Sequence, residues 1–175
     1  YALAMYHPVT TEIDAIEENA NNFVDALIES GKNYVVIYPN NDLGSKHILD
    51  AYKRLVNNNR FKVFPSIRFE YFLTLLKNAN FIIGNSSVGI REAPYYGIPT
   101  VNIGNRQLKR ATSSEIINTS SEKSKILEAL KGLSNKVEVS NEIFGKGNSA
   151  ELFLNSLESQ NLWDINHQKQ FNDAY

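Results

Sequence analysis

The 175-residue sequence contains no cysteine, so disulfides, thiolate metal sites and thiol nucleophiles are all excluded. Its three histidines, His7, His47 and His167, are scattered without the spacing of metal ligands. Carboxylates do not cluster after the predicted strands as a magnesium site requires. We therefore expect neither a metal ion nor a cofactor.

Long hydrophobic runs and an excess of charge of one sign are absent too. The longest apolar runs have about five residues, whereas a membrane-spanning helix needs about 20. Lysine and arginine number 18 against 19 aspartates and glutamates, which gives a formal charge of -1 and no field that would attract a polyanion. We expect a cytoplasmic protein that has neither a membrane nor a nucleic acid as a partner.

Four common catalytic motifs are also missing. The sequence has no G-x-x-x-x-G-K-[ST] loop, no G-x-G-x-x-G after a predicted strand, no H-E-x-x-H and no G-x-S-x-G. These absences disfavour P-loop, dinucleotide-binding, zincin and α/β-hydrolase functions.

The length suits one domain of ordinary size. The sequence does not begin with methionine, and residues 1–6 (YALAMY) already have the composition of a buried strand. We expect the chain to be a piece of a longer protein.

Strand and helix patterns alternate along most of the chain. Continuous apolar runs predict strands at 1–6, 34–38, 61–64, 81–83, 100–103 and 115–118. Three-four apolar spacing predicts helices between them, with Thr10 or Thr11 capping the first, Gly31 ending it and Ser121 capping the last. A further helix is expected at 149–157. This alternation predicts an α/β fold, a three-layer α/β/α Rossmann-like parallel sheet.

Polar residues follow the predicted strands, where ligands bind in open α/β sheets. They are His7, Asn40, residues 65–68, residues 85–87 and residues 104–106. The segment GNSSVG at 84–89 suits a diphosphate, because small residues, two hydroxyls and the free N–H groups of the next helix meet there. An ordinary helix cap explains the segment equally well.

Each candidate ligand also has a structural alternative. Glu92 suits the hydroxyls of a ribose or a surface pair with Arg91. His7 suits an acid, a base or a phosphate donor, or a purely structural role. Arg106 suits the binding of a phosphoryl group, or the role of a solvated cation in a loop. Phe69 suits a nucleobase or the core.

Longer motifs add a resemblance to a known family. The sequences HPVT at 7–10, YPN at 38–40, GNSSVGIREAP at 84–94 and PTVNIGNRQ at 99–107 resemble the UDP-N-acetylglucosamine 2-epimerase family. The resemblance covers the family's carboxyl-terminal domain only, and GNSS is similar to its hydrolysing branch. It implies the C-terminal half of a glycosyltransferase-B type fold. A UDP-binding domain would span 1–157, and a tail helix at 158–175 would pack back on a missing N-terminal domain.

The resemblance also implies a ligand and residue roles. UDP or a UDP-N-acetylhexosamine would bind with Ser86 and Ser87 on the phosphates and Glu92 on the ribose. Phe69 would lie beside the uracil, Asn40 and Arg106 would line the site, and His7 would be the catalytic histidine of the cleft. Relatives have a glycine at the position of Lys109. Because this loop departs from the family pattern, Arg110 is not included among the predicted site residues.

The implied chemistry is elimination of UDP to a glycal, followed by addition of water. The whole enzyme would release N-acetylmannosamine or a related amino sugar for sialic-acid-like or polysaccharide biosynthesis, with proton-transferring carboxylates in the missing domain. A homodimer of the full-length protein is left open. Two alternatives stay open: the C-terminal half of a UDP-sugar glycosyltransferase, and a non-catalytic flavodoxin-like binding module.

Overall fold

The computed structural model describes residues 1–110, 115–133, 144–164 and 168. The chain divides into two compact units, Tyr1–Asn141 and Glu142–Tyr175. The first unit holds the sheet and the second holds two helices.

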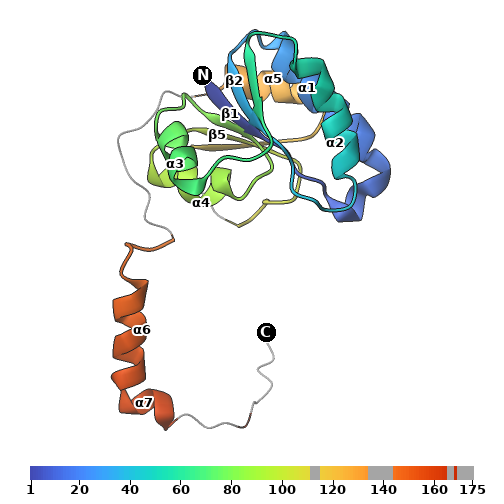
Figure 1. Cartoon of the computed structure of the whole chain (residues 1–175). Coiled ribbons are helices and arrows are strands. Elements are labelled where there is room, and N and C mark those ends of the chain that lie inside the picture. Colours follow the sequence, from blue (N-terminus) through green and yellow to red (C-terminus); the bar gives the residue numbers. More distant parts are fainter. Residues whose placement is uncertain (111–114, 134–143, 165–167, 169–175) are drawn as a thin grey trace. The chain divides into compact units, whose positions relative to one another are not determined.

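A parallel sheet of six strands forms the centre of the first unit (Figure 1). Its strands are β1 (Ala2–Met5), β2 (Tyr34–Ile37), β3 (Phe61–Phe64), β4 (Ile82–Gly84), β5 (Thr100–Ile103) and β6 (Ile116–Thr119). Their order across the sheet is β3-β2-β1-β4-β5-β6, and every neighbouring pair is parallel. The predicted fold class is confirmed.

Helices cover both faces of this sheet. On one face lie α1 (Ile16–Glu29), α2 (Ser45–Tyr52) and α5 (Lys123–Lys131), and on the other lie α3 (Phe69–Lys77) and α4 (Val88–Tyr95) (Figure 1). A short 3-10 helix, η2 (Lys53–Leu55), continues α2. Alternate residues of β1 enter the two cores: Ala2 and Ala4 face α1, whereas Leu3 faces α3. The three central strands β1, β2 and β4 are apolar because both of their faces are buried.

The strand order reverses direction between β1 and β4. The chain moves outward from β1 through β2 to β3, and then returns to place β4 on the other side of β1. Ligands of open α/β sheets bind at such a switch point, beyond the carboxyl ends of the strands. Here those ends are followed by His7 and by residues 85–87.

The first helix begins later than predicted. Residues Thr10–Ala15 form a 3-10 helix, η1, which is interrupted by the non-helical Glu12 (φ -127°, ψ 38°), and α1 begins only at Ile16. Neither threonine caps a helix through its side chain. The side chains of Ile13 and Ile16 lie so close to Gly44 that a Cβ there would meet both, so packing on Gly44 accompanies the irregular start.

Of two other predicted helix ends, one fits the structure and one does not. Gly31 has a φ of +68° directly after α1, as its predicted role as a C-cap requires. Ser121 does not cap α5, which begins at Lys123 after an extended Glu122 with no side-chain cap. That prediction was wrong, because extended Glu122 separates Ser121 from the helix.

The second unit contains α6 (Ser149–Glu158) and α7 (Gln160–Trp163). The predicted helix at 149–157 is confirmed. The indole Nε1 of Trp163 donates a hydrogen bond to the carbonyl of Leu157 at 2.8 Å. Several apolar side chains of this unit are exposed, namely Leu152, Phe153, Leu154 and Trp163. The domain boundary at 157 and the packing of the tail on a further domain stay predictions, and residues 165–167 and 169–175 lie outside the described residues.

Within the described part of the chain, no helix has the length and apolarity needed to cross a membrane.

Gly84 is the position in the sheet that tolerates a side chain least. Its φ is +137°, and a Cβ there would lie 1.8 Å from the carbonyl oxygen of Met5. We expect Gly84→Ala to lower the free energy of unfolding by about 3 kcal/mol or more, because overpacking adds to backbone strain. Urea unfolding followed by circular dichroism measures this change.

Gly31→Ala is the matched control. Its φ is also positive, but the nearest atom to a new Cβ is the tip of Arg60 at 3.4 Å. It should cost about 1 to 2 kcal/mol, the strain alone. Equal losses for the two variants would contradict a close approach of β1 and β4.

Candidate functional site

Asn85 joins the ends of β1 and β4. The main-chain N–H of His7 donates to Asn85 Oδ1 at 2.7 Å, and Asn85 Nδ2 donates back to the carbonyl of His7 at 2.8 Å. The main-chain N–H of Asn85 also donates to the carbonyl of Met5 at 3.1 Å. Asn85 is fully buried. The side chain thus continues the strand pairing beyond the point where both strands end.

The imidazole of His7 is held in one protonation form. The main-chain N–H of Asn40 donates to Nδ1 of His7 at 3.1 Å, which requires a lone pair on Nδ1. In the neutral ring the proton is then on Nε2. Burial lowers the pKa of His7 to about 4, the Arg106 cation lowers it as well, and Asp42 acts weakly in the opposite direction. At neutral pH the ring is uncharged and offers an N–H donor at Nε2.

Arg106 is anchored to the same point from the far side. Its Nη1 donates to the carbonyl of Asn85 at 3.1 Å, and Nε2 of the buried Gln107 donates to that carbonyl at 3.3 Å. The predicted alternative of a solvated loop cation is wrong for Arg106, because its guanidinium is bonded and half-buried. A fixed positive charge therefore lies at the exit of β5, near His7.

The serines begin α4. Ser86 is buried, and the N–H of Val88 donates to its Oγ at 3.4 Å, a long bond that caps the helix only weakly. Ser87 is the N-cap residue of α4, but its side chain forms no cap hydrogen bond. The first N–H groups of α4 donate within its first turn, that of Gly89 to the carbonyl of Ser86 at 3.2 Å and that of Ile90 to the carbonyl of Ser87 at 3.0 Å. The hydroxyl of Ser87 makes no cap hydrogen bond, so it suits an anion at this positive helix end.

Glu92 lies on α4 with one carboxylate oxygen enclosed. Its Oε2 has almost no solvent contact and no hydrogen-bond partner among the described residues. Leaving a buried carboxylate oxygen without a donor is costly, so the site has an acceptor that lacks its donor. Sugar hydroxyls are donors of the required kind.

Asn40 and Phe69 lie at the exits of β2 and β3. Asn40 contributes its main-chain N–H to His7, while its side chain is exposed and bonds Asp42. Phe69 is the first residue of α3 and is 61% exposed, so the alternative that placed it in the core is wrong. An exposed aromatic ring at this edge is available to stack on a flat ligand.

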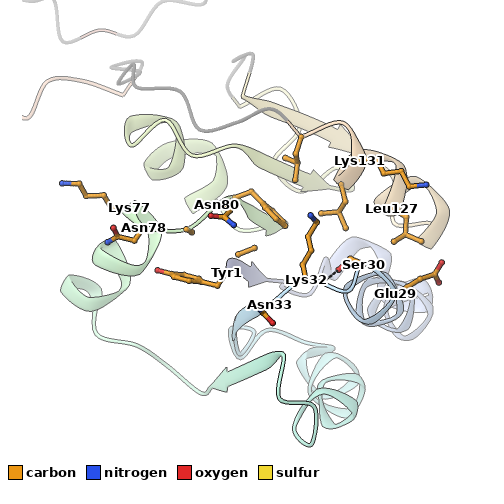
Figure 2. Close-up of a pocket in the computed structure, with 15 residues that line it drawn as sticks. Tyr1, Glu29, Ser30, Lys32, Asn33, Lys77, Asn78, Asn80, Leu127 and Lys131 are labelled. Atoms are coloured by element: carbon orange, nitrogen blue, oxygen red, sulfur yellow. Dashed lines mark hydrogen bonds between the residues drawn. The ribbon is translucent and has the colours of Figure 1, made fainter.

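A cavity of about 1300 Å³ lies elsewhere, at the amino ends of the strands (Figure 2). It contains none of the predicted site residues. Its cations do not converge: Figure 2 shows Lys77 and Lys131 on opposite sides, and Lys32 lies 5.9 Å from the centre of the Phe81 ring. We place the site at the carboxyl ends of the strands, where a cation, hydroxyls and a carboxylate oxygen without a donor among the described residues are gathered, rather than in this cavity.

Among the residues that the structure describes, no three His, Asp or Glu side chains gather where a metal ion could bind.

Comparisons with known proteins identify relatives of this chain. The sequence model of the family described as UDP-N-acetylglucosamine 2-epimerase matches residues 1–158. The chain belongs to this family. It is 42% identical to a UDP-N-acetylglucosamine 2-epimerase of Neisseria meningitidis over 178 residues, which is 99% of this chain and 47% of that protein. It is 27% identical to a hydrolysing UDP-N,N'-diacetylbacillosamine 2-epimerase of Legionella pneumophila over 150 residues, or 85% and 40% of the two chains.

Solved structures show the same fold. The UDP-GlcNAc 2-epimerase of Methanocaldococcus jannaschii, solved with UDP-GlcNAc and UDP, superimposes with a TM-score of 0.70 at 21% identity. The match covers 90% of this epimerase-family chain and 45% of that one. The chain therefore spans about half the length of the relatives that it matches.

Sequence reasoning did not place Asn85 or Gln107 in the site. Asn85 is one of the polar residues that follow the predicted strands, but no role is predicted for it, because its bonding partner His7 lies 78 residues away along the chain. Gln107 ends the PTVNIGNRQ motif and is 2% exposed. The signal available in the sequence was a polar residue after an apolar strand segment.

The pKa of His7 yields a prediction. A side-chain NMR titration should give a midpoint of about 4. Arg106→Gln should raise this midpoint because it removes a neighbouring cation, and Asp42→Asn should lower it because it removes an anion. An unchanged midpoint in Arg106→Gln would contradict the electrostatic contact.

The lowered pKa of His7 also makes the free energy of unfolding depend on pH. The unfolded chain binds the histidine proton with an ordinary pKa of 6.5, whereas the folded chain binds it near 4. The unfolded state therefore holds more protons in this window, and stability falls as the pH is lowered through it. His7→Gln should lack this part of the pH dependence.

Proposed function

We propose that this chain is the UDP-binding domain, and the C-terminal half, of a hydrolysing UDP-N-acetylglucosamine 2-epimerase. The observation that carries the proposal is the meeting of three strand exits around Asn85. His7 and Arg106 are both bonded to that residue, and Ser86 follows it.

The site suits a nucleoside diphosphate in a single orientation. The diphosphate would lie at the start of α4, on the hydroxyls of Ser86 and Ser87 and near the guanidinium of Arg106. Glu92 would accept hydrogen bonds from the ribose and so satisfy its enclosed Oε2. Phe69, exposed at the start of α3, would lie beside the uracil, and Asn40 would line the same site.

The proposed reaction begins with loss of UDP from the sugar. The C1–O bond breaks with its electrons on the phosphate oxygen, the proton at C2 goes to a carboxylate of the rest of the enzyme, and water then adds to the glycal. The neutral His7 ring suits a donor to the departing phosphate rather than a base, because its Nδ1 already accepts from Asn40.

The hydrolysing branch and the sugar are the finer part of the proposal. The GNSS sequence supports hydrolysis, as does the similarity to the hydrolysing Legionella enzyme. The product would be N-acetylmannosamine or a related amino sugar for sialic-acid-like or polysaccharide biosynthesis. We place the whole protein in the cytoplasm, with the tail at 158–175 packed on an N-terminal domain. A homodimer remains compatible with this assignment.

Calorimetry with UDP tests the binding site. Glu92→Gln and Ser86→Ala should each weaken binding by about 1 to 3 kcal/mol, the scale of a lost hydrogen bond to a charged or buried group. Glu128→Gln, on the exposed face of α5, is the matched control and should leave the affinity unchanged. Weaker UDP binding by Lys131→Gln, with no effect of Glu92→Gln, would instead place UDP in the cavity at the amino ends of the strands.

Turnover tests the division of labour between this chain and the rest of the enzyme. The 175-residue chain should bind UDP weakly but release no N-acetylmannosamine from UDP-N-acetylglucosamine, because the carboxylates for proton transfer would lie elsewhere. A coupled assay for free N-acetylmannosamine checks this. Release by the chain alone would show that it carries the complete machinery, and binding of FMN instead of UDP would favour a flavodoxin-like module.

A further inference from the structure

We infer that Asn85 is the positioning residue of the site, which sets the His7 ring against the Arg106 guanidinium. This inference rests on the proposed function, because it assigns a role within the same UDP site. Asn85 itself is fully buried, and the oxygen and nitrogen of its side-chain amide both bond the main chain of His7.

The contacts of Asn85 point in two directions. Its side chain fixes the main chain of His7 through two reciprocal bonds of 2.7 and 2.8 Å. Its carbonyl fixes the side chain of Arg106 at 3.1 Å. One residue therefore determines where the neutral donor and the cation lie relative to each other.

An amide is the only side chain of this length that satisfies both bonds to His7. His7 offers one donor, its N–H, and one acceptor, its carbonyl, and an amide supplies the complementary pair. A carboxylate would place a buried negative charge against the His7 carbonyl, and an apolar side chain would leave both main-chain groups unsatisfied.

The orientation of the His7 ring depends on the same attachment. The bond from the Asn40 N–H to Nδ1 forms only when the main chain of His7 follows its observed path. Without Asn85, the exit of β1 loses its side-chain attachment to β4. The ring is then free to turn toward solvent, away from both Asn40 and Arg106.

The test compares Asn85→Ala with Asn102→Ala in the 175-residue chain. Asn102 is also buried, lies on the adjacent β5 and bonds Asn118, but has no bond to His7. Both variants should lose stability. Only Asn85→Ala should move the NMR titration of His7 toward the ordinary value of 6.5 and mix the two ring tautomers in the ¹⁵N spectrum. It should also raise the Kd for UDP by about tenfold, whereas Asn102→Ala should change it by less than about twofold.

Two outcomes overturn the inference. One is a His7 titration and tautomer that stay unchanged in Asn85→Ala while stability falls, which makes Asn85 a purely structural residue. The other needs no variant, and so stands even if Asn85→Ala does not fold: exchange of the His7 amide hydrogen in the unaltered chain as fast as that of an exposed loop. We expect it to exchange as slowly as the amides of β1, because it donates to a buried oxygen.

A failure of the proposed function gives a different result. If the unaltered chain does not bind UDP, the nucleotide assignment fails, but the titration and the exchange measurement still report whether Asn85 positions His7.

Discussion

The close approach of β1 and β4 at their carboxyl ends is the constraint on which the site depends. The backbone of Gly84 lies so near the carbonyl of Met5 that any side chain would collide with it. This approach brings Asn85 within hydrogen-bond distance of the main chain of His7. Arg106 then bonds the carbonyl of Asn85, so that three separate loops are held by one buried residue. A site built on strand ends in this way is more rigid than one built on loops alone.

The electrostatics of the site follow from the same packing. His7 is half-buried beside a cation, and both effects lower its pKa to about 4. An imidazole with an ordinary pKa would be partly charged near neutral pH, whereas this one stays neutral. In the proposed UDP site, Arg106 would then be the source of positive charge toward the diphosphate, and His7 would act as a dipolar donor. The sequence alone allowed an acid, a base or a donor, because the burial and the Asn40 contact are both tertiary.

Most of the fold was predictable because the signal is local. Apolar runs such as residues 34–37 form strands, and three-four spacing forms the helices between them. The predictions failed where contacts between residues far apart in the sequence determine the local structure. The start of α1 is displaced because Ile13 and Ile16 pack on Gly44, and Glu12 accepts a hydrogen bond from Asn105, 93 residues away. No pattern within residues 9–16 contains that information.

The candidate site shows the same division. Serines and a glutamate at a strand exit are visible in the sequence, but only the structure shows that Glu92 Oε2 is enclosed and has no donor among the residues described. An enclosed, unpartnered acceptor lowers the stability of the free protein, because its lost hydration is not replaced. A ligand hydroxyl that donates to Glu92 Oε2 supplies the missing hydrogen bond. The free energy of that bond then contributes to ligand binding instead of to folding. This reciprocal relation is a physical reason to read Glu92 as part of a ligand site, since a carboxylate with a purely structural role would have its donor within the fold.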